Sequence, residues 1–142
     1  MITIGWREWI SLPELNIPRI KIKVDTGART SALHAFHVEH YRDKVKFLIH
    51  PYQQKKQKTS SVIECVAKLK EMRTVTDSGG HKEERPVIET LIELNGRRWP
   101  IEITLTSRDD MRFRMLLGRT AMTHRLLVDP SKSYLLGKKK IS

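Results

Sequence analysis

The fold of this chain is decided by the stretch Arg19-Ile-Lys-Ile-Lys-Val-Asp-Thr-Gly27. Apolar residues alternate with basic ones as far as Val24, which is the pattern of a β-strand with one buried face. The strand then delivers a carboxylate, a hydroxyl and a glycine that is free to turn with positive φ. The sequence therefore predicts an acidic side chain, Asp25, held at the corner between a strand and a loop.

Short strands are the commonest predicted element in the rest of the chain. Apolar and polar residues alternate in several runs, and Asn95-Gly96 is a favoured two-residue hairpin turn between two of them. One short helix is expected after Gly118, over 119–127, stopped near Asp129-Pro130. We expect a single all-β domain over 1–142, with strands at 45–49, 63–69, 88–94 and 99–105 and final strands at 126–128 and 133–136.

The segment 74–86 separates two of these strands and contains the pair Gly79-Gly80. Paired glycines between two β runs predict a flexible hairpin tip. Such a hairpin could serve as a lid over a cleft. The alternative is an ordinary solvent-exposed loop.

Composition limits the class of protein. The chain has 142 residues, enough for one domain with an ordinary core, and no apolar run approaches the roughly 20 residues that span a bilayer. Its N-terminus lacks the basic start and apolar stretch of a signal peptide. Its single cysteine, Cys65, excludes an internal disulfide framework and suits a reducing compartment. We therefore expect a cytoplasmic protein that does not enter a membrane.

The formal net charge of +11 is the strongest compositional signal. It predicts attraction to polyanions, namely nucleic acid, an acidic protein tail or an anionic membrane surface. The alternative is that lysine-rich loops at 55–58 and 138–140 only keep the protein soluble. No aromatic residues are interleaved with these lysine runs, so they do not predict a stacking platform for single strands.

Several ordered blocks of the sequence resemble a known family. The block Val24-Asp-Thr-Gly-Ala-Arg-Thr-Ser-Ala-Leu-His-Ala35 resembles the signature of a bacterial and archaeal group of retropepsin-like aspartic proteases, widely labelled ATP-dependent zinc proteases. Asp-Thr-Gly alone would be weak, since an Asp at a strand end commonly just forms a turn. The likeness continues through nearly the whole chain, at 85–88, 104–108, Met111, 115–119 and 127–129.

This resemblance implies a closed β-barrel with a flap hairpin and one short helix, acting as a symmetric homodimer. A two-fold interface sets each residue opposite its own copy, so Asp25 would face a second Asp25 and the pair would share one proton. The resemblance makes Asp25 catalytic. It implies that the supporting residues of the acid loop are Thr26, Gly27, Ala28, Leu117 and Gly118, with Leu116 and Leu117 packed behind that loop and Gly118 opening the turn.

The chain departs from retroviral relatives after the acid loop, where Arg29 and Thr30 replace acidic residues. Arg29 and Arg119 then lack their usual acidic partner, and unpaired guanidinium groups suit carboxylates. We expect an acidic, Glu-rich peptide substrate, bound by these arginines and by Gly79 and Gly80 of the flap. The alternative is that Arg29 pairs with a structural acid: Asp109, Asp110 or Glu84. Family members are often associated with ATP-grasp ligases that add glutamate.

The zinc and ATP of the family label are not predicted by these residues. His34, His37 and His40 lie three apart, which in a strand points His37 away from the other two. The chain has no His-Glu-x-x-His and no phosphate-binding Gly-Lys-Ser/Thr loop, so we expect neither a metal nor another cofactor. Two alternative functions remain: a basic binding module for nucleic acid or ribosomal protein, and a metal-assisted hydrolase using the three histidines.

Overall fold

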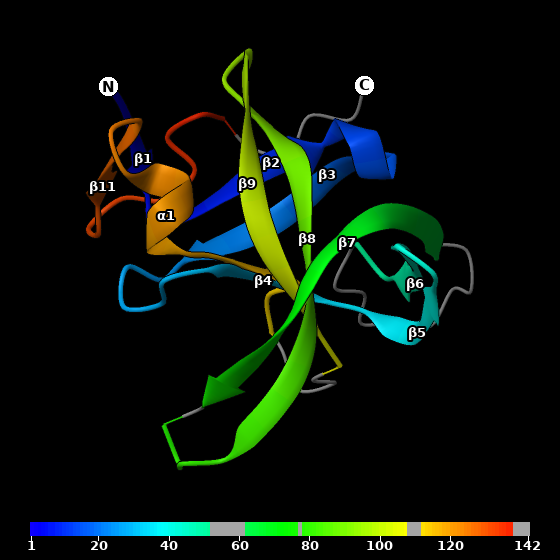
Figure 1. The fold of residues 1–142 in the computed structure, drawn as a ribbon. Helices are drawn as coiled ribbons and strands as arrows, with labels where there is room; N and C mark the ends of the chain where they lie inside the picture. The colour runs from blue at the N-terminus through cyan, green and yellow to red at the C-terminus, as the bar shows by residue number, and fades with distance from the viewer. Residues whose placement is uncertain (52–61, 77, 108–111, 138–142) are drawn as a thin grey trace.

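A computed structural model describes residues 1–51, 62–76, 78–107 and 112–137 of the chain (Figure 1). Nearly all of its regular structure is β-strand, together with one short α-helix and one turn of 3-10 helix. The elements are β1 (Ile2–Gly5), β2 (Arg7–Leu12), η1 (Pro13–Leu15), β3 (Ile17–Val24), β4 (Ser31–His34), β5 (Phe36–Tyr41), β6 (Lys44–Ile49), β7 (Ile63–Thr76), β8 (Lys82–Leu94), β9 (Arg97–Thr106), β10 (Met115–Leu117), α1 (Arg119–Met122) and β11 (Leu126–Asp129).

The main sheet closes on itself to form a barrel. Its strands follow the order β2-β3-β10-β4-β9-β8, and Ser11 of β2 pairs with Glu93 of β8 to complete the ring. Strands β7, β6 and β5 continue the sheet outward from β8 as a curled extension, visible beside the barrel in Figure 1. The first and last strands, β1 and β11, pair separately in parallel. The predicted all-β, retropepsin-like fold is confirmed.

Strand β10 decides where the site forms, because it inserts between two strands that are neighbours in sequence. It runs parallel to β3, with Leu117 beside Val24, and antiparallel to β4. Each strand of a parallel pair ends at the same edge of the sheet. The residues after β3 and after β10, Asp25 and Gly118, therefore emerge side by side.

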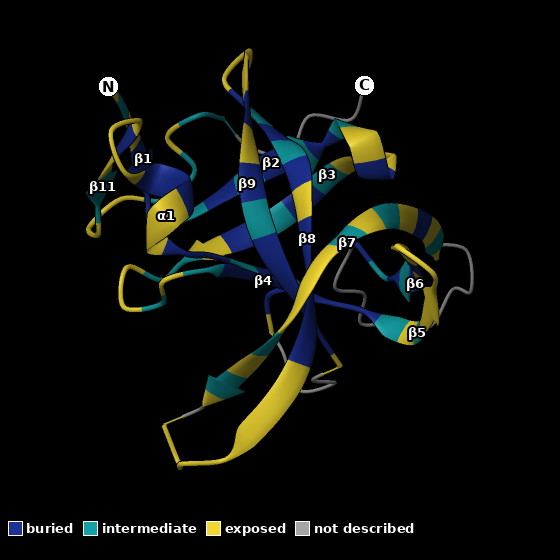
Figure 2. Ribbon diagram, in the orientation of Figure 1, coloured by how far each residue is buried: buried dark blue, intermediate teal, exposed yellow. Residues whose placement is uncertain are grey.

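The hairpin of β7 and β8 projects from the barrel, and Figure 2 shows that its outer part is exposed along β8 and alternates between exposed and half-buried along β7. Both strands are longer than the sequence predicts: β7 runs to Thr76 and β8 begins at Lys82. The segment 74–86, which is expected from the sequence to separate the two strands, is instead largely part of them. Cross-strand pairing continues almost to the glycine turn, where Gly80 has a φ of 84°. A long two-stranded arm with a short tip results.

The core is almost wholly apolar; it fills the barrel and continues under the extension, where Val45, Phe47 and Ile49 of β6 are buried. Residues that alternate along β2 and β3, including Ile10, Ile20 and Ile22, are buried, whereas the intervening Lys21 and Lys23 point outward. This confirms the half-buried strand that leads to Asp25. The predicted strands at 45–49, 63–69, 88–94, 99–105 and 126–128 are also present.

Two expectations near the C-terminus are wrong. The helix α1 ends at Met122, because Thr123 leaves the helical region with a ψ of 128° and the chain turns into β11. Residues 133–136 form no strand. Their backbone is held instead by Glu8, whose carboxylate accepts hydrogen bonds from the N–H groups of Leu135 and Leu136. The lysine runs at 55–58 and 138–140 lie outside the described residues.

Candidate active site

The acid loop follows β3 and holds the Asp25 carboxylate by short-range bonds. The Gly27 N–H donates to Asp25 Oδ1 at 3.1 Å, and the Ala28 N–H donates to the Asp25 carbonyl at 3.2 Å. A Cβ on Gly27 would lie 3.3 Å from the same Oδ1, so a side chain there would crowd the carboxylate. The Asp25 N–H donates to the Leu117 carbonyl at 2.9 Å. The carboxylate is thus fixed at the corner that the sequence predicts.

A second loop, from Gly118 into α1, is packed directly against the acid loop. A Cβ on Gly118 would lie 2.4 Å from the carbonyl carbon of Thr30, so only glycine allows this approach. Gly118 directly precedes α1, and its φ of −87° is ordinary, so the close approach and not a positive φ requires glycine here. The Gly118 N–H donates to Ser31 Oγ at 3.0 Å.

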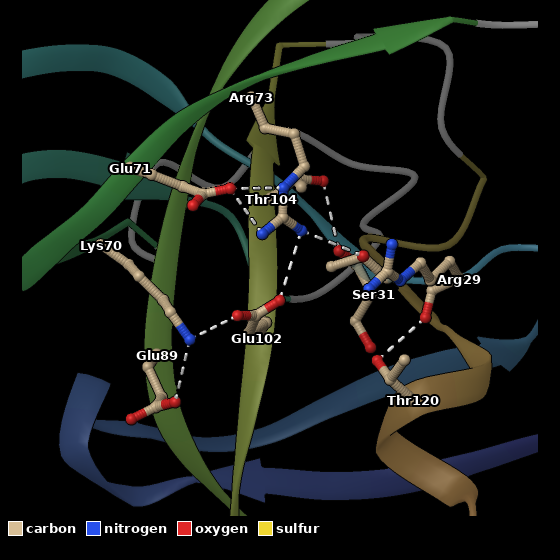
Figure 3. Close-up of polar contacts among 10 residues, drawn as sticks. Arg29, Ser31, Lys70, Glu71, Arg73, Glu89, Glu102, Thr104 and Thr120 are labelled. Atoms are coloured by element: carbon tan, nitrogen blue, oxygen red, sulfur yellow. Dashed lines mark hydrogen bonds and ion pairs between the residues drawn. The ribbon is translucent and has the colours of Figure 1, made fainter.

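Four further hydrogen bonds tie these two loops together, two from backbone N–H groups and two from side chains. The Arg119 N–H donates to the Ala28 carbonyl at 2.7 Å, and Thr120 donates to the Arg29 carbonyl from both its N–H and its hydroxyl (Figure 3). The Arg119 guanidinium also donates to the Thr26 carbonyl at 3.0 Å. One donor of Arg119, which the sequence assigns to substrate, is therefore used to hold the acid loop.

A cleft of about 410 Å³ opens beside the acid loop, under the β7–β8 hairpin. Its polar lining contains three arginines, Arg29, Arg73 and Arg85, and no carboxylate among the described residues. The full lining is Gly27–Thr30, Ala32, Arg73–Thr76, Arg85, Thr104 and Leu116. Leu116 is half-buried and forms part of this wall. This corrects the expectation that Leu116 packs behind the acid loop, whereas Leu117 is fully buried as expected.

Arg73 connects the hairpin to the acid loop across this cleft, as Figure 3 shows. Its guanidinium donates to Glu71 at 2.7 Å, to Glu102 of β9 at 3.3 Å, and to the Thr30 hydroxyl at 3.4 Å. Lys70 pairs with the other oxygen of Glu102 at 2.5 Å. The hydrogen bond from Lys70, followed by that from Arg73, lowers the pKa of Glu102 below its ordinary value. Charge on Glu102 is thereby maintained where the hairpin meets the barrel.

The remaining predicted substrate residues divide between the cleft and the hairpin tip. Arg29 lines the cleft, and its side chain makes no ion pair with any described residue. Of its three expected alternative partners, Glu84 instead accepts a hydrogen bond from Thr74, and Asp109 and Asp110 lie outside the described residues. Gly79 and Gly80 lie at the exposed hairpin tip, beyond the residues that line the cleft.

The three histidines do not converge. His34 is buried on β4, whereas His37 and His40 are exposed on β5. Within the described parts of the chain, no three His, Cys, Asp or Glu side chains are grouped so that they could hold a metal ion.

Burial raises the pKa of the Cys65 thiol to about 12, which makes it a poor nucleophile. No helix in the described residues is long and apolar enough to cross a membrane.

Several site residues escape prediction from sequence. Arg73 sits among other charged residues of the hairpin, and nothing local singles it out. Arg85 begins the block 85–88 that resembles the family, but nothing in that block marks it as a cleft residue. Ser31 and Thr104 are buried hydroxyls, joined by a hydrogen bond from Thr104 Oγ1 to the Ser31 carbonyl at 3.2 Å. A polar residue at a strand position that the pattern predicts to be buried could have pointed to this site, because a buried polar group needs a hydrogen-bond partner inside the protein.

The closed barrel, with its acid loop laid against the loop after β10, defines a retropepsin-like protein. The sequence model of the family described as "Retropepsin-like aspartic endopeptidase RimB" matches residues 3–139, and the chain belongs to this RimB-like family. A crystal structure of a protein of unknown function from Legionella pneumophila has the same fold, with a TM-score of 0.75 and 22% identity, covering 94% of this chain and 97% of that one.

Longer relatives carry a different name. Proteins called "Probable alpha-L-glutamate ligase" from Shewanella pealeana and Parasynechococcus marenigrum are 43% and 46% identical to this chain over 140 residues. The match covers 96% of this chain but only 30% and 29% of those proteins. The chain thus spans less than a third of the length of these relatives.

Proposed function

We propose that the chain is an aspartic endopeptidase whose catalytic dyad is formed by Asp25 from each of two copies. The observation that carries this proposal is the Asp25 carboxylate, which accepts a hydrogen bond from the N–H of Gly27, a residue that lines the cleft. The backbone of Asp25 is anchored by the bond from its N–H to the Leu117 carbonyl. One carboxylate cannot supply both a general acid and a general base at once. A second copy supplies the other, because a two-fold axis sets equivalent residues opposite each other.

In this mechanism the two carboxylates lie about 3 Å apart and share one proton. The ionised member takes a proton from water as that water attacks the peptide carbonyl, and the protonated member donates a hydrogen bond to the carbonyl oxygen. The apparent pKa values belong to the pair rather than to either Asp25. The contacts from Gly118 and Arg119 to the acid loop keep the two carboxylates in register. Thr26 is exposed in the single chain and is available to bond across the dimer.

The substrate that fits this cleft is an acidic peptide rich in glutamate. Three arginines and no described carboxylate line the cleft. Arg73 already pairs with Glu71 and Glu102, and Arg85 pairs with Glu83 at 3.4 Å. Arg29 has no described ion-pair partner and is therefore the arginine available to a substrate carboxylate. A guanidinium group binds a carboxylate through two parallel hydrogen bonds. Relatives are named as probable glutamate ligases, which supports a substrate class made of added glutamate and a functional association with such a ligase. A buried free thiol is compatible with work in the cytoplasm.

The test is cleavage of a peptide library by the wild type and by Asp25→Asn. The library pairs each Glu-rich peptide with a version in which Gln replaces Glu, so length and shape are matched. We expect the wild type to cut the Glu-rich members faster, with activity lost in Asp25→Asn and unchanged by a chelator. Arg29→Ala should reduce the preference for Glu over Gln. Equal cleavage of both peptide types, with a ratio that Arg29→Ala leaves unchanged, would remove the acidic substrate from the proposal.

A further inference from the structure

A cluster of cations and aromatic rings covers the outer side of β2 and β3, and we call it the basic–aromatic face. Its members are Arg7, Lys21, Lys23 and Arg112, with the rings of Trp6, Trp9, Phe113 and Tyr134. Two of its cations are each held near two rings. Arg7 lies 4.6 Å from the Trp6 ring and 4.9 Å from Tyr134, and Lys21 lies 5.8 Å from Trp9 and 5.4 Å from Phe113.

The rings fix these cations in place, because a charge over an aromatic face is attracted to it. Trp6 and Phe113 also meet edge to face at 5.9 Å, which joins the two cation sites into one unit. Such an arrangement costs little additional side-chain entropy when an anion binds, because the cations are already ordered. The basic–aromatic face is therefore better prepared for an anion than flexible surface lysines would be.

The charge on this face is not balanced within the described residues. No ion pair to a described carboxylate is found for Arg7, Lys21, Lys23 or Arg112. Glu8, the acid on β2, points into the protein and accepts backbone N–H groups. Burial, followed by the charges of Arg7 and Arg112, lowers the pKa of Lys21. The positive charges of the basic–aromatic face therefore lie close together, and no described carboxylate pairs with them.

The basic–aromatic face is continuous with the cleft. Residues that are paired side by side across strands point to the same side of a sheet. One such row runs from Thr104 to Ala32 to Leu116, all lining the cleft, and then to Lys23 and Arg7. With neighbouring strands about 4.8 Å apart, Lys23 is about 5 Å and Arg7 about 10 Å beyond Leu116 at the level of the backbone. An extended peptide leaving the cleft reaches both within a few residues.

We propose that the basic–aromatic face is a substrate-binding site for the acidic side chains of a peptide that extends out of the cleft, with Lys21 and Lys23 as its principal contacts. This inference rests on the proposed function and adds a site outside the cleft arginines. A single-stranded nucleic acid fits less well, because bases need free ring faces for stacking. Here Arg7 and Lys21 already occupy faces of Trp6, Tyr134 and Phe113.

The test measures direct binding by the Asp25→Asn protein, which keeps peptides intact. A fluorescein-labelled Glu-rich peptide is titrated by anisotropy, with the Gln version of that peptide as the ligand control. The double variant Lys21→Gln/Lys23→Gln should weaken binding of the Glu-rich peptide by roughly tenfold, since two exposed pairs are lost. The double variant Lys21→Arg/Lys23→Arg should restore most of that affinity.

The matched control is Lys44→Gln/Lys68→Gln. These two exposed lysines face each other on β6 and β7 and change the net charge equally, so we expect less than a twofold effect. Unchanged affinity in the Lys21/Lys23 variant, or an equal loss in the control, would overturn the proposed site. Tighter binding of a labelled single-stranded RNA of matched charge, lost in the same variant, would replace the peptide as occupant. Cleavage that survives Asp25→Asn would reject the proposed function while leaving this binding result standing.

Discussion

Replacing Gly118 by alanine tests whether the acid loop depends on contact with the loop after β10. The new Cβ would lie 2.4 Å from the Thr30 carbonyl carbon and 2.7 Å from the Ser31 nitrogen. The first distance is about 1 Å short of the separation at which carbon atoms normally meet. Both neighbours are backbone atoms, so relief requires a shift of the chain rather than a new rotamer. We expect a loss of about 2–3 kcal/mol in the free energy of unfolding.

That loss corresponds to a fall in Tm of about 7–10 °C for a domain of this size, measured by calorimetry. The matched control is Gly5→Ala, whose Cβ would lie 2.3 Å from the Lys132 carbonyl oxygen, outside the acid loop. Hydrogen exchange well below both melting temperatures separates the two variants. Only Gly118→Ala should accelerate exchange of the Asp25, Arg119 and Thr120 N–H groups. A Tm within 2 °C of wild type, or equal acceleration in Gly5→Ala, would refute the reasoning.

Three further outcomes follow from buried and paired groups. Glu8→Gln should lower the free energy of unfolding by about 1.5–3 kcal/mol in denaturant titrations, because a buried carboxylate that accepts three backbone N–H groups becomes an amide. Lys70 and Arg73 lower the pKa of Glu102 below its ordinary 4.5, so the stability it contributes is present above that pH and lost as pH falls through the lowered pKa. The stability difference between wild type and Glu102→Gln should therefore shrink on acidification, and a constant difference would contradict this. Cys65, with its pKa raised to about 12, should react with a thiol reagent at pH 8 only as fast as the protein opens, and rapid reaction of the folded protein would show that it is accessible.

The parts of the fold that the sequence predicts well are those where local pattern and burial agree. Strand β3 alternates cleanly, and its Ile20 and Ile22 are buried while Lys21 and Lys23 face out. In strand β2, residue polarity and burial do not agree. It buries Glu8 and turns Trp9 outward, so its pattern gives no reliable strand signal. The carboxylate is tolerated inside because it is satisfied by backbone donors.

In the candidate site, too, some residues can be predicted from local sequence and others cannot. Asp25 and Gly118 are found from local motifs, since each sits where a strand ends and a close approach is required. The positions of Arg73 and of the basic–aromatic face relative to the cleft depend on which strands pair with each other. No short stretch of sequence determines that pairing. Pairing between β10 and β3 is the long-range event that places Leu116 next to Lys23. Only the closed barrel shows that these cations and the cleft share one surface.

The central claim is that two copies of Asp25 make one catalytic site, and a mixing experiment measures this most directly. Asp25→Asn protein is added in increasing amounts to a fixed amount of wild type, and the rate of Glu-rich peptide cleavage is followed after exchange of subunits. If both acids are required, mixed dimers are inactive, so a threefold excess of Asp25→Asn should reduce the rate to about one quarter. A rate that does not change with added Asp25→Asn, while the mixed dimers are shown to form, would contradict the shared dyad.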